Sequence, residues 1–120
     1  MRRKPGELLP LEFDICRSAA TLSRRGFEEF HGYQIAKHLG DEQASRALTA
    51  YGTLYRALSR LEAMGLLESR WEDPEVPAAE NRPGRRLYRL TAAGEAATEA
   101  ARQRVGRKVR GRALRKPRLA

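Results

Sequence analysis

Apolar residues recur at helical spacing near the middle of the chain. One face of a helix there would carry the residues at i, i+3, i+4 and i+7, which are Leu54, Ala57, Leu58 and Leu61. Gly65 follows as a residue typical of the position just beyond a helix end. The pattern predicts a short helix that begins between Ala50 and Thr53 and ends before Gly65.

After this helix, the spacing of apolar residues changes from the helical pattern to a period near two. Residues 66–72 and 85–90 are predicted to be two strands of a hairpin. Residues 73–84 lie between them and contain three prolines, which disfavour both helix and sheet. We therefore expect a long hairpin loop without secondary structure of its own.

Two more helices are predicted before the central one and another after the hairpin. An apolar stripe of Leu8, Leu11, Ile15, Ala19 and Leu22 indicates a helix over residues 8–25, and residues 32–39 are predicted to form the second. Residues 27–30 are expected to be a link. Thr91 is a suitable N-cap for the last helix, which is expected to end near Val105 or Val109.

This order of elements predicts a mainly α chain with a small β-hairpin, an α+β winged helix-turn-helix. The central helix has Tyr55, Arg56, Ser59 and Arg60 on its polar side, and an arginine-rich hairpin follows it. Such a helix fits the major groove of DNA, where arginine can pair with guanine. The alternative is that these residues form an ordinary solvated helix face.

Three sequence runs resemble the PadR family of bacterial transcriptional regulators. They are His-Gly-Tyr-Gln-Ile at 31–35, the whole stretch 51–73, and Arg-Arg-Leu-Tyr-Arg-Leu-Thr at 85–91. The similarity covers roughly residues 8–101 and is closest to short members with a single C-terminal helix. It implies a repressor that binds double-stranded DNA. By this resemblance, Tyr33, Thr53 and Tyr55 would contact backbone phosphates. The residues nearest the bases would be Tyr51, Arg56 and Arg60.

The second half of the hairpin loop carries the other candidate DNA contacts. Arg82, Arg85 and Arg86 flank a Pro-Gly pair and are expected to contact phosphates or the minor groove. A solvated turn is the alternative for these arginines. The loop between the two strands of the hairpin is the wing of this fold. Trp71 is expected to pack beneath the wing, with an effector contact as its alternative role.

A homodimer is expected because one short helix reads only a few base pairs, whereas two helices on a pseudo-palindromic operator read more. The N- and C-terminal helices are expected to form the dimer through Leu11, Ile15, Ala19, Leu22, Ala97 and Ala101. Some relatives in the family bind flat hydrophobic molecules, which leaves a small hydrophobic effector open as a further partner.

The net charge of +9 is concentrated in one segment. Of the 24 Lys and Arg residues, nine lie between Arg102 and Arg118 without any acid, and the other 15 match the 15 Asp and Glu residues. We divide the chain into a flexible arm at 1–7, a winged-helix domain at 8–105 and a disordered basic tail at 106–120. A competing function is non-specific nucleic-acid or RNA-associated binding driven by that tail.

Other classes of protein find little support in the sequence. Cys16 is the single cysteine, and His31 and His38 have no neighbouring cysteine, so we expect no metal site and no cofactor. His31 is expected to fix the start of the second helix. No serine lies in a nucleophile-elbow motif, so the chain is not expected to be an enzyme. Without a membrane span or signal-peptide core, we expect a cytoplasmic, nucleoid-associated protein.

Overall fold

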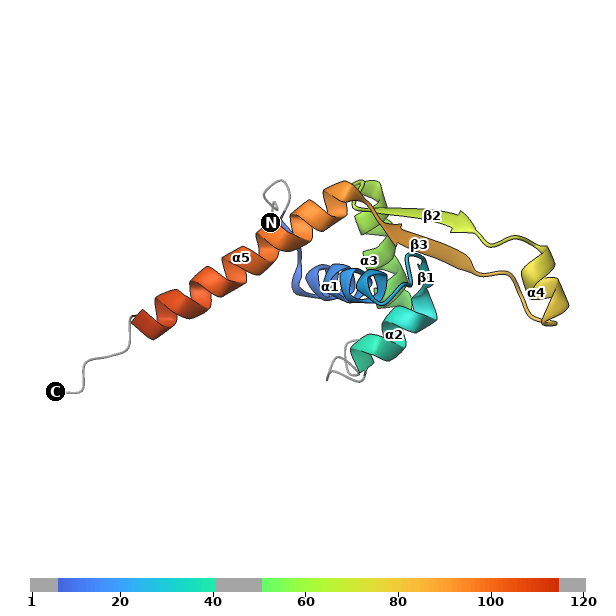
Figure 1. The fold of residues 1–120 in the computed structure, drawn as a ribbon, viewed down its shortest axis with the longest axis horizontal. Coiled ribbons are helices and arrows are strands. Elements are labelled where there is room, and N and C mark those ends of the chain that lie inside the picture. The colour runs from blue at the N-terminus through green and yellow to red at the C-terminus, as the bar shows by residue number, and fades with distance from the viewer. Residues whose placement is uncertain (1–6, 41–50, 115–120) are drawn as a thin grey trace.

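The computed structural model describes residues 7–40 and 51–114, with side chains described over 7–39 and 52–106. Residues 1–6 of the predicted arm and residues 115–120 of the predicted tail lie outside this part. The elements in chain order are α1 (Pro10–Arg24), β1 (Phe30–His31), α2 (Gly32–Gly40), α3 (Tyr51–Ala63), β2 (Leu67–Trp71), α4 (Glu75–Ala79), β3 (Arg86–Leu90) and α5 (Ala92–Leu114). The hairpin and α5 extend in opposite directions from the packed helices (Figure 1).

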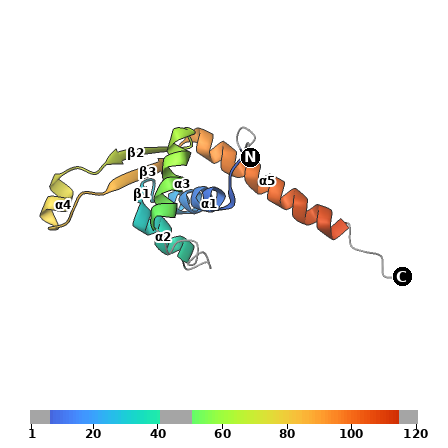
Figure 2. The ribbon, with the colours of Figure 1, turned by 180° about the vertical axis from the view of Figure 1, so that it is seen from behind.

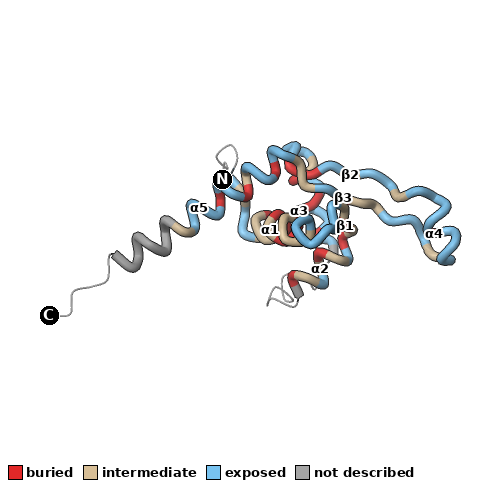
Figure 3. Tube along the Cα trace, in the orientation of Figure 1, coloured by how far each residue is buried: buried red, intermediate tan, exposed pale blue. Residues whose placement is uncertain are grey.

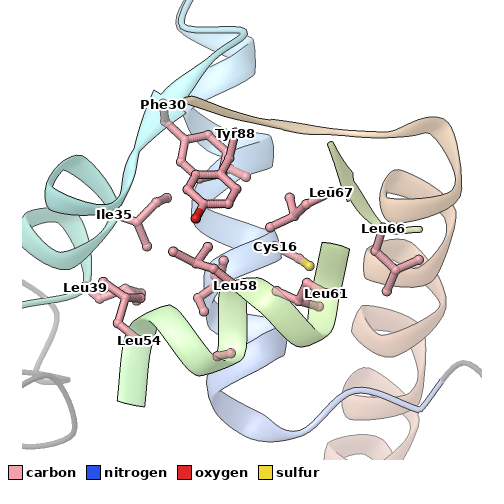
Figure 4. Packing of buried hydrophobic residues seen from close by; sticks show 13 residues of the cluster. Cys16, Phe30, Ile35, Leu39, Leu54, Leu58, Leu61, Leu66, Leu67 and Tyr88 are labelled. Carbon is pink, nitrogen blue, oxygen red and sulfur yellow. The ribbon is translucent and has the colours of Figure 1, made fainter. Parts of the chain in front are cut away.

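The hydrophobic core lies where α1, α2 and α3 meet the sheet (Figure 4). The apolar stripe predicted for α3 is fully buried, since Leu54, Ala57, Leu58 and Leu61 are each 0% exposed. Phe30 and Tyr88 close the sheet side, with ring centroids 6.0 Å apart. Most buried residues lie at this centre, whereas the far end of the hairpin is mostly exposed (Figure 3).

Two glycines end helices in the same way. Gly26 after α1 has φ 95°, and Gly65 after α3 has φ 77°, both in the left-handed region where glycine carries no side-chain penalty. After α3, the Gly65 amide donates to the Glu62 carbonyl and the Leu66 amide donates to the Leu61 carbonyl, at 2.9 Å each. This Schellman arrangement turns the chain directly from α3 into β2.

The sheet has three antiparallel strands in the order β1-β3-β2. The β2–β3 hairpin confirms the two predicted strands, and the register pairs Ser69 with Tyr88 and Trp71 with Arg86. The sequence predicts that residues 27–30 are a link without secondary structure. This prediction is wrong for Phe30, which pairs with Tyr88 as part of β1. A two-residue strand carries too short a pattern to be recognised from sequence.

The hairpin loop also differs from the prediction. It contains the five-residue helix α4, visible at the far end of the hairpin in Figures 1 and 2, where we expected no secondary structure. Pro74 precedes the helix and Pro77 lies within its first turn, where a missing amide leaves no helical hydrogen bond unmade. Pro77 is also the buried residue of α4, so it anchors the loop.

The last helix begins as predicted and ends later. Thr91 accepts the Gly94 amide at 2.9 Å as an N-cap, and its hydroxyl donates to the Gly65 carbonyl at 2.7 Å. The helix continues through Gly106 and Gly111 to Leu114, so residues 106–114 of the predicted disordered tail are helical. Helix propensity penalises a glycine by about 1 kcal/mol, which is too little to end a helix of this length.

We expect Gly94→Ala to destabilise the fold by about 1–3 kcal/mol or more. A Cβ at Gly94 would lie 2.2 Å from the Leu66 carbonyl oxygen and 2.6 Å from Leu90 Cδ1, so α5 would have to move away from the α3–β2 turn. Gly106→Ala in the same helix is the matched control. A Cβ at Gly106 would have no heavy atom outside its own helix backbone within 4 Å. The substitution should therefore raise the free energy of unfolding by about 1 kcal/mol. Chemical denaturation measures both, and equal effects would contradict the close packing of α5.

Candidate nucleic-acid interface

The outward side of α3 is the first part of the candidate interface. Because the opposite side is fully buried, Tyr55, Arg56 and Ser59 all face solvent, and Tyr55 is 44% exposed. Arg56 Nη2 contacts Thr53 Oγ1 at 3.4 Å, and no carboxylate in the described part of the chain is paired with its guanidinium. Arg56 is therefore available to an outside acceptor. The prediction for Tyr51 stays a prediction, since its side chain lies outside the described residues.

Arg60 differs from Arg56 because its guanidinium has a carboxylate partner within the chain. Its Nε donates to Glu12 Oε2 at 2.9 Å, and Glu12 in α1 has a fully buried side chain. A buried carboxylate is costly unless a cation or hydrogen-bond donors compensate it, so this contact ties Arg60 to α1. Arg60 thus holds α3 against α1 through its Nε, while the side chain stays 44% exposed, and its expected place nearest the bases stays a prediction.

The wing arginines fall into two groups. Arg82 forms a two-pronged ion pair with Glu72, with Nη2–Oε2 at 3.0 Å, and also pairs with Glu80. These bonds hold the pKa of the Glu72 carboxyl below its usual range and raise that of Arg82. Arg82 is therefore engaged within the loop, contrary to the expectation of a free DNA contact. Arg86 Nη2 lies 3.7 Å from Glu62 Oε2, a single and longer ion pair, and Arg85 has no carboxylate partner for its guanidinium among the described residues.

Trp71 is exposed and does not pack beneath the wing as expected. The residue is 64% exposed, and the Arg86 guanidinium lies 5.5 Å from its ring centroid. Arg86 Nε also donates to Ser69 Oγ at 3.0 Å, so Arg86 is held over the ring. Trp71 and Arg86 are cross-strand partners at the end of the hairpin ladder, where the guanidinium and the ring attract each other.

A groove of about 440 Å³ joins α3 to the wing. Its walls are aromatic and basic, formed by His31, Gly32, Tyr33, Tyr55, Trp71, Gly84, Arg85, Arg86 and Tyr88. The Tyr55 hydroxyl lies over Gly32 at the start of α2, 2.8 Å from where a Cβ would stand. Tyr33, which is 58% exposed, stacks on His31 with centroids 6.2 Å apart. Sequence reasoning missed His31 and Trp71 as members of this surface, because their neighbours come from other elements.

His31 caps α2, as expected. The Gln34 amide donates to His31 Nδ1 at 3.3 Å, and the His31 amide donates to Gln34 Oε1 at 2.9 Å. This reciprocal pair satisfies two backbone amides at the helix start. Burial, followed by the positive charges of Arg85 and Arg82, lowers the pKa of the His31 imidazole. The ring therefore stays neutral at physiological pH.

The residues expected at a dimer interface do not share one surface. Ile15 and Ala19 are 0% and 2% exposed and belong to the core of the protomer, and Ala101 is buried too. Leu11, Leu22 and Ala97 are half-buried and border that core. An α1 stripe with helical spacing is explained by packing within the chain, so Ile15 and Ala19 are removed from the candidate interface.

The described residues show none of the arrangements that a metal site, a reactive thiol or a membrane helix would need. Within the described residues, no group of three His, Cys, Asp or Glu side chains is arranged to hold a metal ion. Burial raises the pKa of the Cys16 thiol to about 11, so the thiol remains protonated. None of the helices in the described part of the chain is both long enough and apolar enough to cross a bilayer.

We expect Arg60→Ala to lower the free energy of unfolding by about 1.5–3 kcal/mol, the range for a hydrogen bond to a charged group. The loss arises because Glu12 is buried and would lose a cationic partner. Arg56→Ala, one turn earlier on the same helix, is the control and should change stability by less than about 0.5 kcal/mol. Urea unfolding distinguishes the two. Equal, small effects would return Arg60 to the set of free arginines.

Comparisons with known proteins agree with this geometry. The sequence pattern of the transcriptional regulator PadR-like family matches residues 22–100. A PadR family transcriptional regulator from Eggerthella lenta is 28% identical, with a TM-score of 0.54, over 87% of this chain and 96% of that one. A PadR family transcription regulator from a hypervirulent Clostridium difficile is 27% identical, with a TM-score of 0.57, over 85% and 97%.

A PadR-like transcriptional regulator from Bacillus cereus shares the fold at 21% identity, with a TM-score of 0.64, over 90% of this chain and 93% of that one. A search of curated proteins found no significant match. The family match includes α2, α3 and the whole hairpin, the elements that form the aromatic and basic groove. The chain therefore belongs to the PadR-like family of transcriptional regulators, which act by binding DNA.

Proposed function

We propose that the protein is a homodimeric repressor that binds a pseudo-palindromic operator through α3 and the wing. The observation that carries the proposal is the outward face of α3, where Arg56 has no carboxylate partner among the described residues. A DNA partner also favours a cytoplasmic, nucleoid-associated location. The protein would act by occupying DNA and not by catalysing a reaction.

The roles of the interface residues follow from their chemistry. Arg56 can donate two hydrogen bonds to guanine O6 and N7 in the major groove, with Ser59 beside it on the same face. The hydroxyls of Tyr33, Thr53 and Tyr55 suit phosphate oxygens, which fix the position of the helix on the duplex. Arg85 and Arg86 extend this phosphate surface onto the wing.

A dimer would use the outer faces of α1 and α5. A hollow of about 320 Å³ lies between them and is lined by Glu7, Leu8, Pro10, Phe13, Asp14, Ala101, Arg104 and Val105. Val105 is 50% exposed there, which supports apolar contact with a second copy. The same hollow is the apolar site we would assign to a small hydrophobic effector. The half-buried Leu11, Leu22 and Ala97 would lie beneath this interface.

The runner-up function is non-specific binding through the basic C-terminal segment. The nine Lys and Arg residues between Arg102 and Arg118, without any acid, support it. Such binding would depend on phosphate charge and would hardly distinguish one duplex from another. The DNA preference of the Arg56 variant separates the two functions.

We expect Arg56→Ala to weaken binding to the preferred duplex by about 1–3 kcal/mol in each half-site, the range for one bidentate pairing with a base. Binding to an unrelated duplex should change little, because that affinity comes from phosphates. Fluorescence anisotropy with both duplexes measures the difference. Arg70→Ala is the control, since Arg70 pairs with Glu29 at 2.7 Å on the other face of the sheet.

Two outcomes would contradict the proposal. If Arg56→Ala weakened binding to both duplexes equally, Arg56 would contact only phosphate and α3 would not read sequence through it. If the wild-type protein bound all duplexes with equal affinity, the basic-segment function would replace the operator function.

A further inference from the structure

Two side chains from distant parts of the chain meet at the rim of the aromatic and basic groove. His31 lies at the junction of β1 and α2, and Arg85 lies just before β3. His31 Nε2 and Arg85 Nη1 are 3.3 Å apart. Both residues line the groove between α3 and the wing. The two nitrogens are close enough for a hydrogen bond. Whether Nε2 accepts from Arg85 or is itself a donor depends on which ring nitrogen carries the imidazole proton.

The cap of α2 determines where that proton lies. The Gln34 amide is in the first helical turn, where backbone amides have no partner within the helix. It donates to His31 Nδ1, so this nitrogen must present its lone pair. A neutral imidazole has one N–H and one lone pair. The ring proton is therefore on Nε2, the nitrogen that faces Arg85.

An arginine guanidinium has donors only. The Nε2–H of His31 and the Nη1–H of Arg85 are thus two donors brought together without an acceptor of their own. The nearby carboxylate of Glu72 is already committed, because it accepts from the Arg82 guanidinium and from the Arg85 backbone amide. Two converging donors at the rim of a groove form the frame of a site for an anionic oxygen.

We infer that the His31 Nε2–H and the Arg85 guanidinium together hold one phosphate oxygen of the DNA backbone, with His31 acting as an uncharged ligand. The inference rests on the proposed DNA-binding function and adds a residue to it. The phosphate would lie beside Tyr33 and Tyr55, which are 58% and 44% exposed and line the same groove. His31 would then both start α2 and bind the duplex.

The surroundings keep the imidazole uncharged. Arg85 and Arg82 face it from the wing with positive charge, and Glu72 opposes them with its single negative charge. On its own helix it meets the neutral Tyr33 ring and Gln34, and α3 adds only the neutral Tyr55 to the groove. Protonation would place a hydrogen on Nδ1 and break the bond to the Gln34 amide. Binding through this site should therefore need no proton.

Two substitutions separate the two ring nitrogens. His31→Asn keeps an oxygen near the Nδ1 position, which suits an N-cap, but removes the Nε2 donor. His31→Gln keeps an N–H group near the Nε2 position and loses the cap. Thermal unfolding reports the cap, and affinity for a mixed-sequence duplex at several salt concentrations reports the phosphate contact.

For His31→Asn we expect unchanged stability and an affinity lower by roughly 3- to 10-fold for each protomer bound, the factor of one hydrogen bond. The slope of log affinity against log salt should not change, because no charge is removed. Arg85→Gln should flatten that slope by about 0.9 for each protomer bound. His31→Gln should lower stability and bind DNA better than His31→Asn.

Each other result overturns a stated part of this inference. If His31→Asn bound DNA as tightly as the wild type, His31 would be a cap only, while DNA binding itself would stand. If His31→Asn flattened the salt slope, or if calorimetry in buffers of different ionisation heat showed proton uptake on binding, His31 would act as a cation and the neutral contact would be wrong. A wild-type protein that bound no duplex would overturn the proposed function instead.

Discussion

Complete burial of one face of α3 is the constraint on which the rest of the structure depends. Leu54, Leu58 and Leu61 can leave water only against α1, α2 and the sheet, which fixes the rotation of α3 about its axis. Tyr55, Arg56 and Ser59 then face outward as a consequence of that rotation. The burial of leucine side chains therefore determines which face of α3 is exposed.

The other elements are positioned from the end of this helix. Gly65 turns the chain into β2, and Thr91 returns to the same turn through its bond to the Gly65 carbonyl. Gly94 then lets α5 approach the backbone at Leu66. The wing and the long C-terminal helix thus start from one small junction beside α3, so the direction of each relative to the outward face of α3 is set there.

Ion pairs within the chain decide which basic residues are left for a ligand. Arg60 is tied to the buried Glu12, and Arg82 is enclosed by two carboxylates of its own loop. Arg56 and Arg85 lack such carboxylate partners among the described residues. A count of arginines along α3 and the wing therefore overstates the basic surface. The local groove supports DNA binding better than the net charge does.

Local signals predicted the helices and hairpin well, because helical spacing, Gly65 and Thr91 act over a few residues. The same reasoning missed β1, which is two residues long, and α4, where Pro74 and Pro77 occupy positions that a helix tolerates. It also ended α5 too early, since a single glycine is only a small penalty. The Glu12–Arg60 and His31–Arg85 contacts join distant residues, and no local pattern in one sequence reveals them.

The most direct test of the central claim is the selection of bound sequences from a pool of random duplexes by the wild-type protein. If α3 reads bases in a homodimer, the enriched sequences should form an inverted repeat whose half-sites are centred about one DNA turn apart. The two arms should share the same bases. Enrichment of no sequence, or of a single site without two-fold symmetry, would contradict the account.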